Sequence, residues 1–223
     1  MIPGGGFPQP YATGLAPSTN KVLLHFNGAD GATTTTDEYG NTVGLTNVAL
    51  ETDQFKFGTS SLYLPTALSN WAYVRHPGAL GTPITLATNW TMECWVFWPT
   101  TVPNTGDIFS ASNNIDTGGG YIAYGVALQF NTTHTKLRLG LSSDGASWNI
   151  ANLVEAAGAL TAGTWHHVAV TYDASAGHYY SYLNGVMVHD ITSAAVVNSI
   201  NTLSVGGPNT GYGAIQGYLD EYR

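Results

Sequence analysis

Charged residues are scarce in this sequence of 223 residues, and positive charge is the scarcer sign. Lys and Arg together number 6 against 14 Asp and Glu, which gives a formal net charge of -8, and no basic cluster occurs. Binding to nucleic acid or to an anionic membrane surface depends on clustered positive charge. The composition therefore argues against both as partners.

Cysteine and long apolar runs are also nearly missing. Cys94 has no second cysteine to pair with, and its apolar neighbours predict a small buried residue rather than a reactive thiol. No apolar run approaches the roughly 20 residues that span a bilayer. The N-terminus lacks the basic and apolar stretches of a secretory signal. We therefore expect neither membrane insertion nor a signal peptide.

A sustained helical period is the third absence, and it indicates a chain with little helix. Residues 1–20 contain four prolines and four glycines without apolar periodicity, which predicts an extended arm or linker. Residues 21–223 instead alternate short β-rich runs with Gly, Asn, Asp and Pro. All-β sandwiches reach this length as one domain, so we expect one folded unit over 21–223.

The strand pattern predicts a two-sheet antiparallel β-sandwich of the jelly-roll type. The sequence Asn184-Gly185 lies between two β-rich runs, and this pair readily adopts the positive φ values of a type I′ turn, so residues 178–191 should form a tight hairpin. The predicted strands cover residues 22–26, 60–64, 91–98, 124–130, 137–141, 165–172, 178–183, 186–191 and 214–222.

Six short motifs follow one another along residues 21–223. They are VLLHFNG at 22–28, FGTSSLY at 57–63, WTMECWV at 90–96, WHHVAVTY at 165–172, LNG at 183–185 and GYLDEYR at 217–223. In this order they resemble the concanavalin A-like, laminin-G-like domains, and that resemblance implies the jelly-roll sandwich. Family members continue for a short stretch beyond the last motif, so we expect the sequence to be part of a longer polypeptide.

The opening motif and the Pro/Gly arm resemble the versions of this domain found in phage tail and virion proteins. The resemblance implies a non-enzymatic virion module that forms homo-oligomers and packs on other virion proteins, with host surface glycans as a further candidate ligand. Its expected location is the virion surface. One alternative is a bacterial extracellular carbohydrate-binding module, and another is a polysaccharide hydrolase or lyase of the same fold. Fold alone does not decide among these functions.

The carboxylates argue against the hydrolase. Glycosidases of this fold place two carboxylates on one strand face, flanking the glycosidic bond. Glu93 shares its face with Trp95, whereas the adjacent Asp220 and Glu221 should point to opposite faces. We therefore predict that the protein is not an enzyme.

Zinc and serine chemistry find little support as well. The neighbouring His166 and His167 would alternate between strand faces, so they cannot both ligate one ion. The Gly-x-Ser-x-Gly turn of the α/β-hydrolases does not occur in the sequence.

Structural calcium is the cofactor that the resemblance suggests, because related domains hold one where an early loop meets the closing strand. The corresponding ligands here are Asp30 and Asp220, since hard cations prefer carboxylate and carbonyl oxygens. The alternative is that Asp30 is a turn residue and that Asp220 organises a hydrogen-bond network.

Aromatic residues make up 12% of the chain and provide the candidate glycan contacts. A sugar ring presents an apolar face edged with hydroxyls, so it suits an exposed aromatic ring beside polar side chains. The candidates in polar, glycine-rich segments are Trp71, Tyr73, Tyr121, Trp148 and Tyr212, with protein-protein packing as their alternative role. The tryptophans of the motif strands are instead expected in the core: Trp90, Trp95, Trp98 and Trp165.

Overall fold

The computed structural model describes most of the predicted folded unit. The described residues are 22–40, 42–65, 73–75, 86–100, 106–112, 124–156, 159–197, 202–206 and 215–223. The predicted arm at 1–20 lies outside them, as do the glycan candidates Trp71, Tyr121 and Tyr212.

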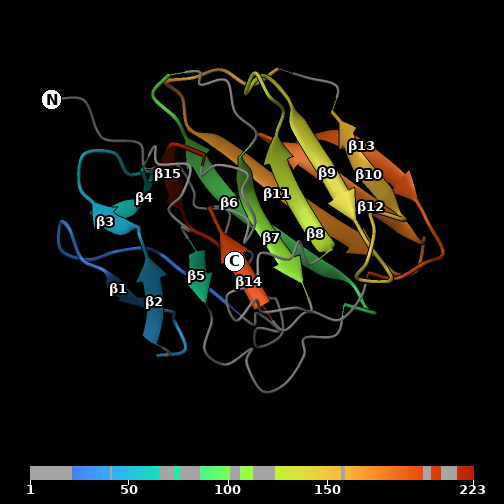
Figure 1. Ribbon diagram of the computed structural model, residues 1–223, viewed down its shortest axis with the longest axis horizontal. Helices are drawn as coiled ribbons and strands as arrows, with labels where there is room; N and C mark the ends of the chain where they lie inside the picture. The colour runs from blue at the N-terminus through green and yellow to red at the C-terminus, as the bar shows by residue number, and fades with distance from the viewer. Residues whose placement is uncertain are drawn as a thin grey trace, which may run out of the picture.

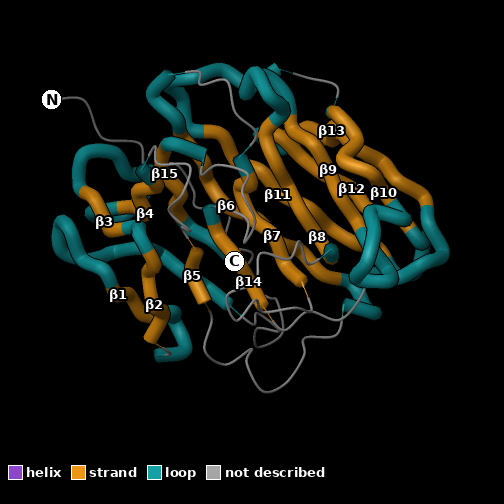
Figure 2. Tube along the Cα trace, in the orientation of Figure 1, coloured by secondary structure: helices purple, strands orange, loops and turns teal. Residues whose placement is uncertain are grey.

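Within these residues the chain forms strands and no helix, so no helix is present that could cross a membrane (Figures 1 and 2). The strands are β1 (Thr34–Thr36), β2 (Thr42–Thr46), β3 (Ala49–Glu51), β4 (Ser61–Leu64), β5 (Tyr73–Arg75), β6 (Trp90–Phe97), β7 (Asp107–Ser112), β8 (Gly125–Phe130), β9 (Leu137–Leu141), β10 (Ala151–Glu155), β11 (His166–Asp173), β12 (His178–Leu183), β13 (Val186–Thr192), β14 (Thr202–Val205) and β15 (Gly217–Asp220).

Two antiparallel sheets face each other and form the sandwich that the sequence predicts (Figure 1). One sheet has seven strands in the order β13-β12-β11-β6-β15-β4-β3, and the other has five in the order β10-β9-β8-β7-β14. A smaller sheet, β1-β2-β5, lies beside β14 through β5. The expected fold class is therefore confirmed.

Strand alternation fills the space between the two sheets. Along β6, Met92, Cys94 and Val96 are buried while the residues between them are more exposed. From the five-stranded sheet, Leu128 and Phe130 are fully buried in the same core. Burial of each large apolar side chain contributes about 1.5–3 kcal/mol. Cys94 is buried as predicted, and this burial raises the pKa of its thiol.

The hairpin prediction is also confirmed. Asn184 has a φ of 50° and Gly185 a φ of 80°, the two positive values that a type I′ turn requires. Strands β12 and β13 leave this turn as an antiparallel pair that is hydrogen-bonded to β11 through β12.

Two strand predictions near the ends of the domain need correction. Residues 22–26 form no strand; only Leu24 makes a bridge, with Tyr222, through hydrogen bonds of 2.8 and 3.0 Å. The predicted strand at 214–222 shortens to β15, because Glu221 takes a positive φ of 52° that turns the chain out of the extended conformation. The C-terminal residues then lie between residue 24 and β6, where Arg223 exchanges two backbone hydrogen bonds with Glu93.

Candidate functional site

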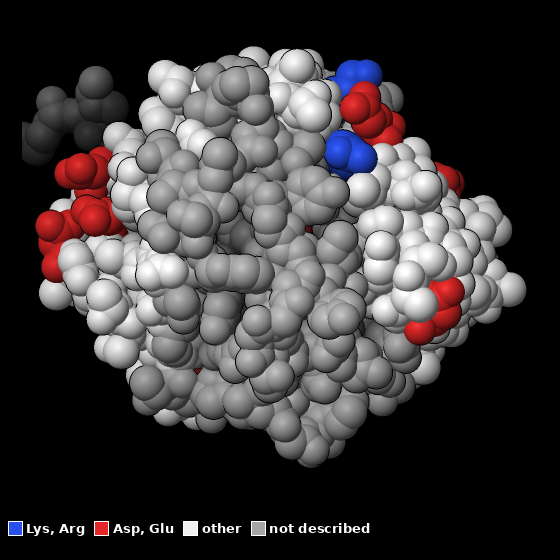
Figure 3. All heavy atoms as spheres, viewed as in Figure 1, with Lys and Arg blue, Asp and Glu red and all other residues white. Residues whose placement is uncertain are grey.

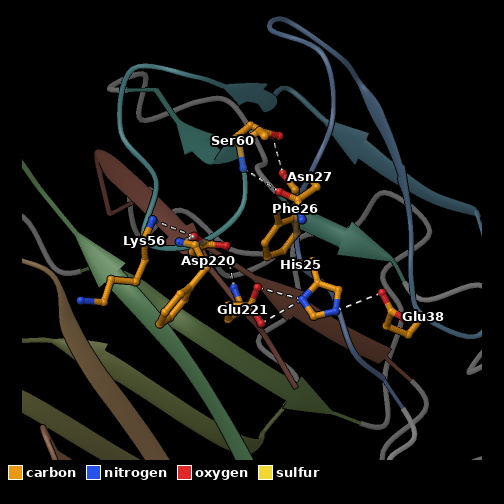
Figure 4. Close-up of polar contacts among 10 residues, drawn as sticks. His25, Phe26, Asn27, Glu38, Lys56, Ser60, Asp220 and Glu221 are labelled. Carbon is orange, nitrogen blue, oxygen red and sulfur yellow. Dashed lines mark hydrogen bonds and ion pairs between the residues drawn. The ribbon is translucent and has the colours of Figure 1, made fainter. Parts of the chain in front are cut away.

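Asp220, the first calcium candidate, holds the loop between β3 and β4 (Figure 4). Its Oδ2 accepts hydrogen bonds from the backbone N–H groups of Lys56 and Phe57 at 2.8 and 3.0 Å, and its Oδ1 accepts one from Glu221 at 2.9 Å. The side chain is fully buried. Burial raises the pKa of Asp220 to about 6, although the loop N–H groups favour the ionised form.

Asp30, the second candidate, is exposed and fixes the start of the same loop. Its Oδ1 accepts hydrogen bonds from the backbone N–H and hydroxyl of Thr52 at 3.1 and 3.2 Å. The two aspartates thus bind different parts of one loop. Among the described residues, no group of three or more His, Cys, Asp or Glu side chains is placed to hold a metal ion. Calcium binding at Asp30 and Asp220 stays a prediction.

A histidine joins this region to the N-terminal segment (Figure 4). His25 Nδ1 lies 2.8 Å from Oε1 of Glu221, and its Nε2 lies 3.0 Å from Oε1 of Glu38. Ser60 adds a hydrogen bond from its hydroxyl to the carbonyl of Phe26 at 2.8 Å. These contacts tie the two ends of the domain together, which is a structural role.

The outer face of the five-stranded sheet carries a polar row that crosses four neighbouring strands. The row follows the strand register: Asp107 of β7 is opposite Gln129 of β8. Gln129 is in turn opposite Arg138 of β9, and Arg138 is opposite Glu155 of β10. The neighbours of Gln129 and Arg138 along their strands face the core. The row therefore points away from the core, and its members run from buried Asp107 to exposed Glu155.

Asp107 is the most perturbed group of this row. It is 2% exposed, and its Oδ1 has no hydrogen-bond partner among the described residues. Burial raises the pKa of Asp107 to about 7, against the opposing effects of a hydrogen bond to Gln129 and the positive charge of Arg138.

Trp148 lies beside the row on the same outer face. A Cβ atom on Gly140 would come within 3.0 Å of the Trp148 ring, so glycine at this position leaves the space that the indole occupies. The edge of the ring meets Tyr124, with centroids 4.8 Å apart and planes at 76°. Both aromatic side chains are partly exposed. Gly140 is two residues from Arg138 on β9, so the aromatic pair lies nearest to the guanidinium end of the row.

Only Trp148 among the predicted glycan residues has a described side chain. Tyr73 lies in β5, of which the structure describes the backbone. The sequence analysis missed Asp107, Gln129 and Arg138, because their grouping depends on strand register. The one available signal was the alternation of polar and apolar residues at 125–130 and 137–141.

The core prediction for the tryptophans is right in part. Trp98 is fully buried, and Trp90 packs against the core. Trp95 and Trp165 are instead partly exposed on the outer face of the seven-stranded sheet, which corrects the expectation for both. Since Cys94 and Val96 point inward, alternation requires Trp95 to point outward.

The adjacent histidines occupy opposite faces, as predicted. His166 is buried and its Nε2 lies 3.0 Å from the carbonyl oxygen of Thr161. His167 lies on the outer face, with its Nε2 3.2 Å from Glu93.

Comparison with known proteins identifies the architecture. A family model described as the concanavalin A-like lectin/glucanases superfamily matches residues 68–223. Comparison with curated protein sequences found no match.

Several solved structures share the fold at low sequence identity. A Trypanosoma rangeli sialidase in complex with sialic acid aligns with a TM-score of 0.62 and 12% identity, over 90% of this chain and 30% of the sialidase chain. The binding domain of botulinum neurotoxin serotype G gives 0.60 and 14%, over 90% and 46%. This chain therefore spans less than half the length of either protein.

One further match is nearly coextensive with this chain. Domain 4 of AbnA, a GH43 extracellular arabinanase from Geobacillus stearothermophilus, was solved in complex with arabinotriose. It aligns with a TM-score of 0.54 and 18% identity, over 91% of this chain and 89% of that domain. At this identity the likeness shows the fold.

Proposed function

Because the chain belongs to the concanavalin A-like lectin/glucanase superfamily, we propose that it is a non-catalytic glycan-binding module. The sugar site is the outer face of the five-stranded sheet. The observation that carries this proposal is the Trp148–Tyr124 pair beside the polar row from Asp107 to Glu155.

The chemistry of this face suits a sugar. An indole offers an apolar surface to the C–H groups of a pyranose or furanose ring, while the partly exposed Arg138 and the exposed Glu155 can bond to its hydroxyls. Asp107 and Gln129 are buried and are not among the proposed sugar contacts. Gln129 and Arg138 are held on adjacent strands, and Arg138 Nε also donates to the carbonyl of Leu153 at 3.4 Å. Groups fixed in this way lose little conformational freedom on binding.

The spacing of the carboxyl groups favours binding over hydrolysis. Glycosidases need two carboxyl groups about 5–9.5 Å apart. Asp107 and Glu155 are the described carboxylates of the polar row, and three strand spacings separate them, which is roughly 14 Å. Bound oligosaccharides are therefore expected to keep their length, as mass spectrometry can check.

The setting in which the module works is a further part of the proposal. We place it on a phage particle, as a structural and adhesion component that meets host glycans, because its motifs resemble the virion versions of this domain. Many copies on one particle would let weak sugar sites act together through avidity. A bacterial extracellular carbohydrate-binding module is the alternative, and the arabinotriose complex of the AbnA domain is the observation that favours it.

A glycan array tests the sugar site directly. The full chain would be screened beside Trp148→Ala and, as a matched aromatic control on the other sheet, Tyr180→Ala. We expect Trp148→Ala to weaken binding at least tenfold, about 1.4 kcal/mol, and Tyr180→Ala to leave it unchanged. Thermal unfolding of each variant verifies the fold. A silent array, or equal binding by Trp148→Ala, would overturn the proposal.

A further inference from the structure

The outer face of the seven-stranded sheet holds a second group of aromatic side chains, distinct from the proposed sugar site. We call it the aromatic face and define it by Tyr63, Trp95, Phe97, Tyr180, Tyr182 and Tyr218. All six are partly exposed. Register places Tyr63, Tyr218 and Phe97 side by side on β4, β15 and β6, while Tyr180 and Tyr182 stand on β12.

Five of these rings pack in two groups, one on each side of β11. Tyr63 and Tyr218 have centroids 5.0 Å apart with planes at 40°, and Phe97 meets Tyr218 at 6.0 Å and 62°. Tyr180 and Tyr182 are 6.4 Å apart. Tyrosine, tryptophan and phenylalanine are enriched in the centres of protein interfaces. The composition of this face is that of an interface centre.

Its size fits the same role. The six residues stand on four strands, with β11 between β6 and β12, and the span from Tyr63 to Tyr180 is roughly 20 Å both across and along the strands. A typical interface covers about 800 Å² per partner. The aromatic face would thus supply the centre of such an interface and leave its margin to the surrounding residues.

Negative charge surrounds the aromatic face at two ends. Glu51 lies two residues after Ala49, the register partner of Tyr63, so it stands on the same face of the edge strand β3. Burial raises the pKa of Tyr218, and Tyr63, Asp53 and Glu51 raise it further. At the other end Asp190 is the register partner of Tyr180. Figure 3 shows acidic side chains gathered at the end of the molecule that holds β3.

Charged side chains near this face have partners of both kinds, and Asp190 Oδ1 lies 2.6 Å from Nδ1 of His178. Lys56 Nζ lies 4.2 Å from the centroid of the Trp95 ring, and Arg223 pairs with Glu93. The margin at the β3 end carries Glu51 and Asp53, which offer negative charge to whatever covers the aromatic face.

We propose that the aromatic face docks a protein partner whose contact patch is apolar at its centre and carries lysines and arginines around it. A second copy of this chain would bring the same acidic margin and be repelled. A basic patch instead matches the charge, and its arginines can also stack on the tyrosines.

A peptide-display selection tests this proposal without a known partner. A random peptide library would be selected on the immobilised full chain. We expect enrichment of peptides that combine Lys or Arg with aromatic or aliphatic residues. Tyr180→Ser combined with Tyr182→Ser should weaken their binding at least tenfold, whereas Trp148→Ala on the other sheet should leave it unchanged.

A charge variant keeps the test valid if the tyrosine variant fails to fold. Asp53→Asn with Asp190→Asn removes two negative charges and no aromatic residue, and it should weaken the selected peptides several-fold, as should added salt. Enrichment of acidic peptides, or binding that ignores both variants, would overturn the proposal. Two other outcomes would also overturn it. Self-association in sedimentation that is lost in the tyrosine variant would assign the face to a second copy of this chain. Glycan-array binding that is lost in the same variant would assign it to a sugar.

Discussion

Replacing Asp107 with Asn should stabilise the protein at high pH and have little effect on stability at low pH. The unfolded carboxyl titrates near 3.8, whereas burial raises the pKa of Asp107 to about 7 in the folded state. Between these values the folded protein holds a proton that the unfolded chain has released. The free energy of unfolding of the wild type therefore falls as pH rises through this window.

The size of the effect follows from the width of the window. Each pH unit removes about 1.4 kcal/mol, so ionisation of Asp107 costs about 4 kcal/mol by the time the pH exceeds 7. Below pH 3.8 the group is protonated in both states and contributes nothing. Asparagine has nearly the same shape and does not titrate, so Asp107→Asn should avoid this loss.

Urea unfolding followed by tryptophan fluorescence measures this difference. The advantage of Asp107→Asn over the wild type should grow by about 4 kcal/mol between pH 4 and pH 8, with the urea dependence unchanged. In a domain of this size that corresponds to a gain of roughly 10 °C in Tm at pH 8. Other carboxylates titrate equally in both proteins and cancel. A stability difference between the two proteins that does not change with pH would refute the raised pKa of Asp107.

Two further substitutions test the loop anchor and the strand packing. Asp220→Ala should lower the free energy of unfolding by about 3 kcal/mol, because it leaves three backbone N–H groups without their acceptor. Thermal unfolding should show the same loss of stability in the presence of calcium and in the presence of a chelator. A wild-type Tm that falls on chelation would assign Asp220 to calcium instead. Gly217→Ala should lower the free energy of unfolding by more than 3 kcal/mol, because its Cβ would lie 2.1 Å from the carbonyl oxygen of Phe97. Gly163→Ala is the control: it has open space around it and should retain the native near-ultraviolet spectrum despite its positive φ. An unchanged denaturation midpoint for Gly217→Ala would contradict the close strand contact.

Much of the fold could be predicted from local sequence. The predicted strands at 137–141 and 178–183 match β9 and β12, because both carry β-rich residues bounded by clear turn signals. Strands such as β1, with the sequence TTT, and β7, with DIFSAS, were missed. They are short, polar or bordered by residues without turn signals, and their neighbours in the sheets stabilise them more than their own sequences do.

The candidate site was harder to predict for the same physical reason. Asp107 and Glu155 are 48 positions apart in the chain, and only the pairing of four strands places them in one row. Trp148 could be proposed as a glycan contact from its polar surroundings, but its packing against Gly140 is visible only in the structure. Trp95 shows the opposite error: its motif suggested the core, while the alternation with Cys94 and Val96 already required the outer face.

The sandwich gives the two proposed contacts a compatible geometry. The polar row with Trp148 and the aromatic face lie on opposite outer surfaces, with two sheets and an apolar core between them. A partner docked on the aromatic face would therefore leave the sugar site directed outward. Avidity requires that tethering and ligand binding occur at once, and it fails when one blocks the other. With only 9% charged residues, long-range attraction adds little to the sugar contact. Affinity for a glycan-coated surface must then come from many modules presented in one orientation, and docking through the face opposite the sugar site achieves that.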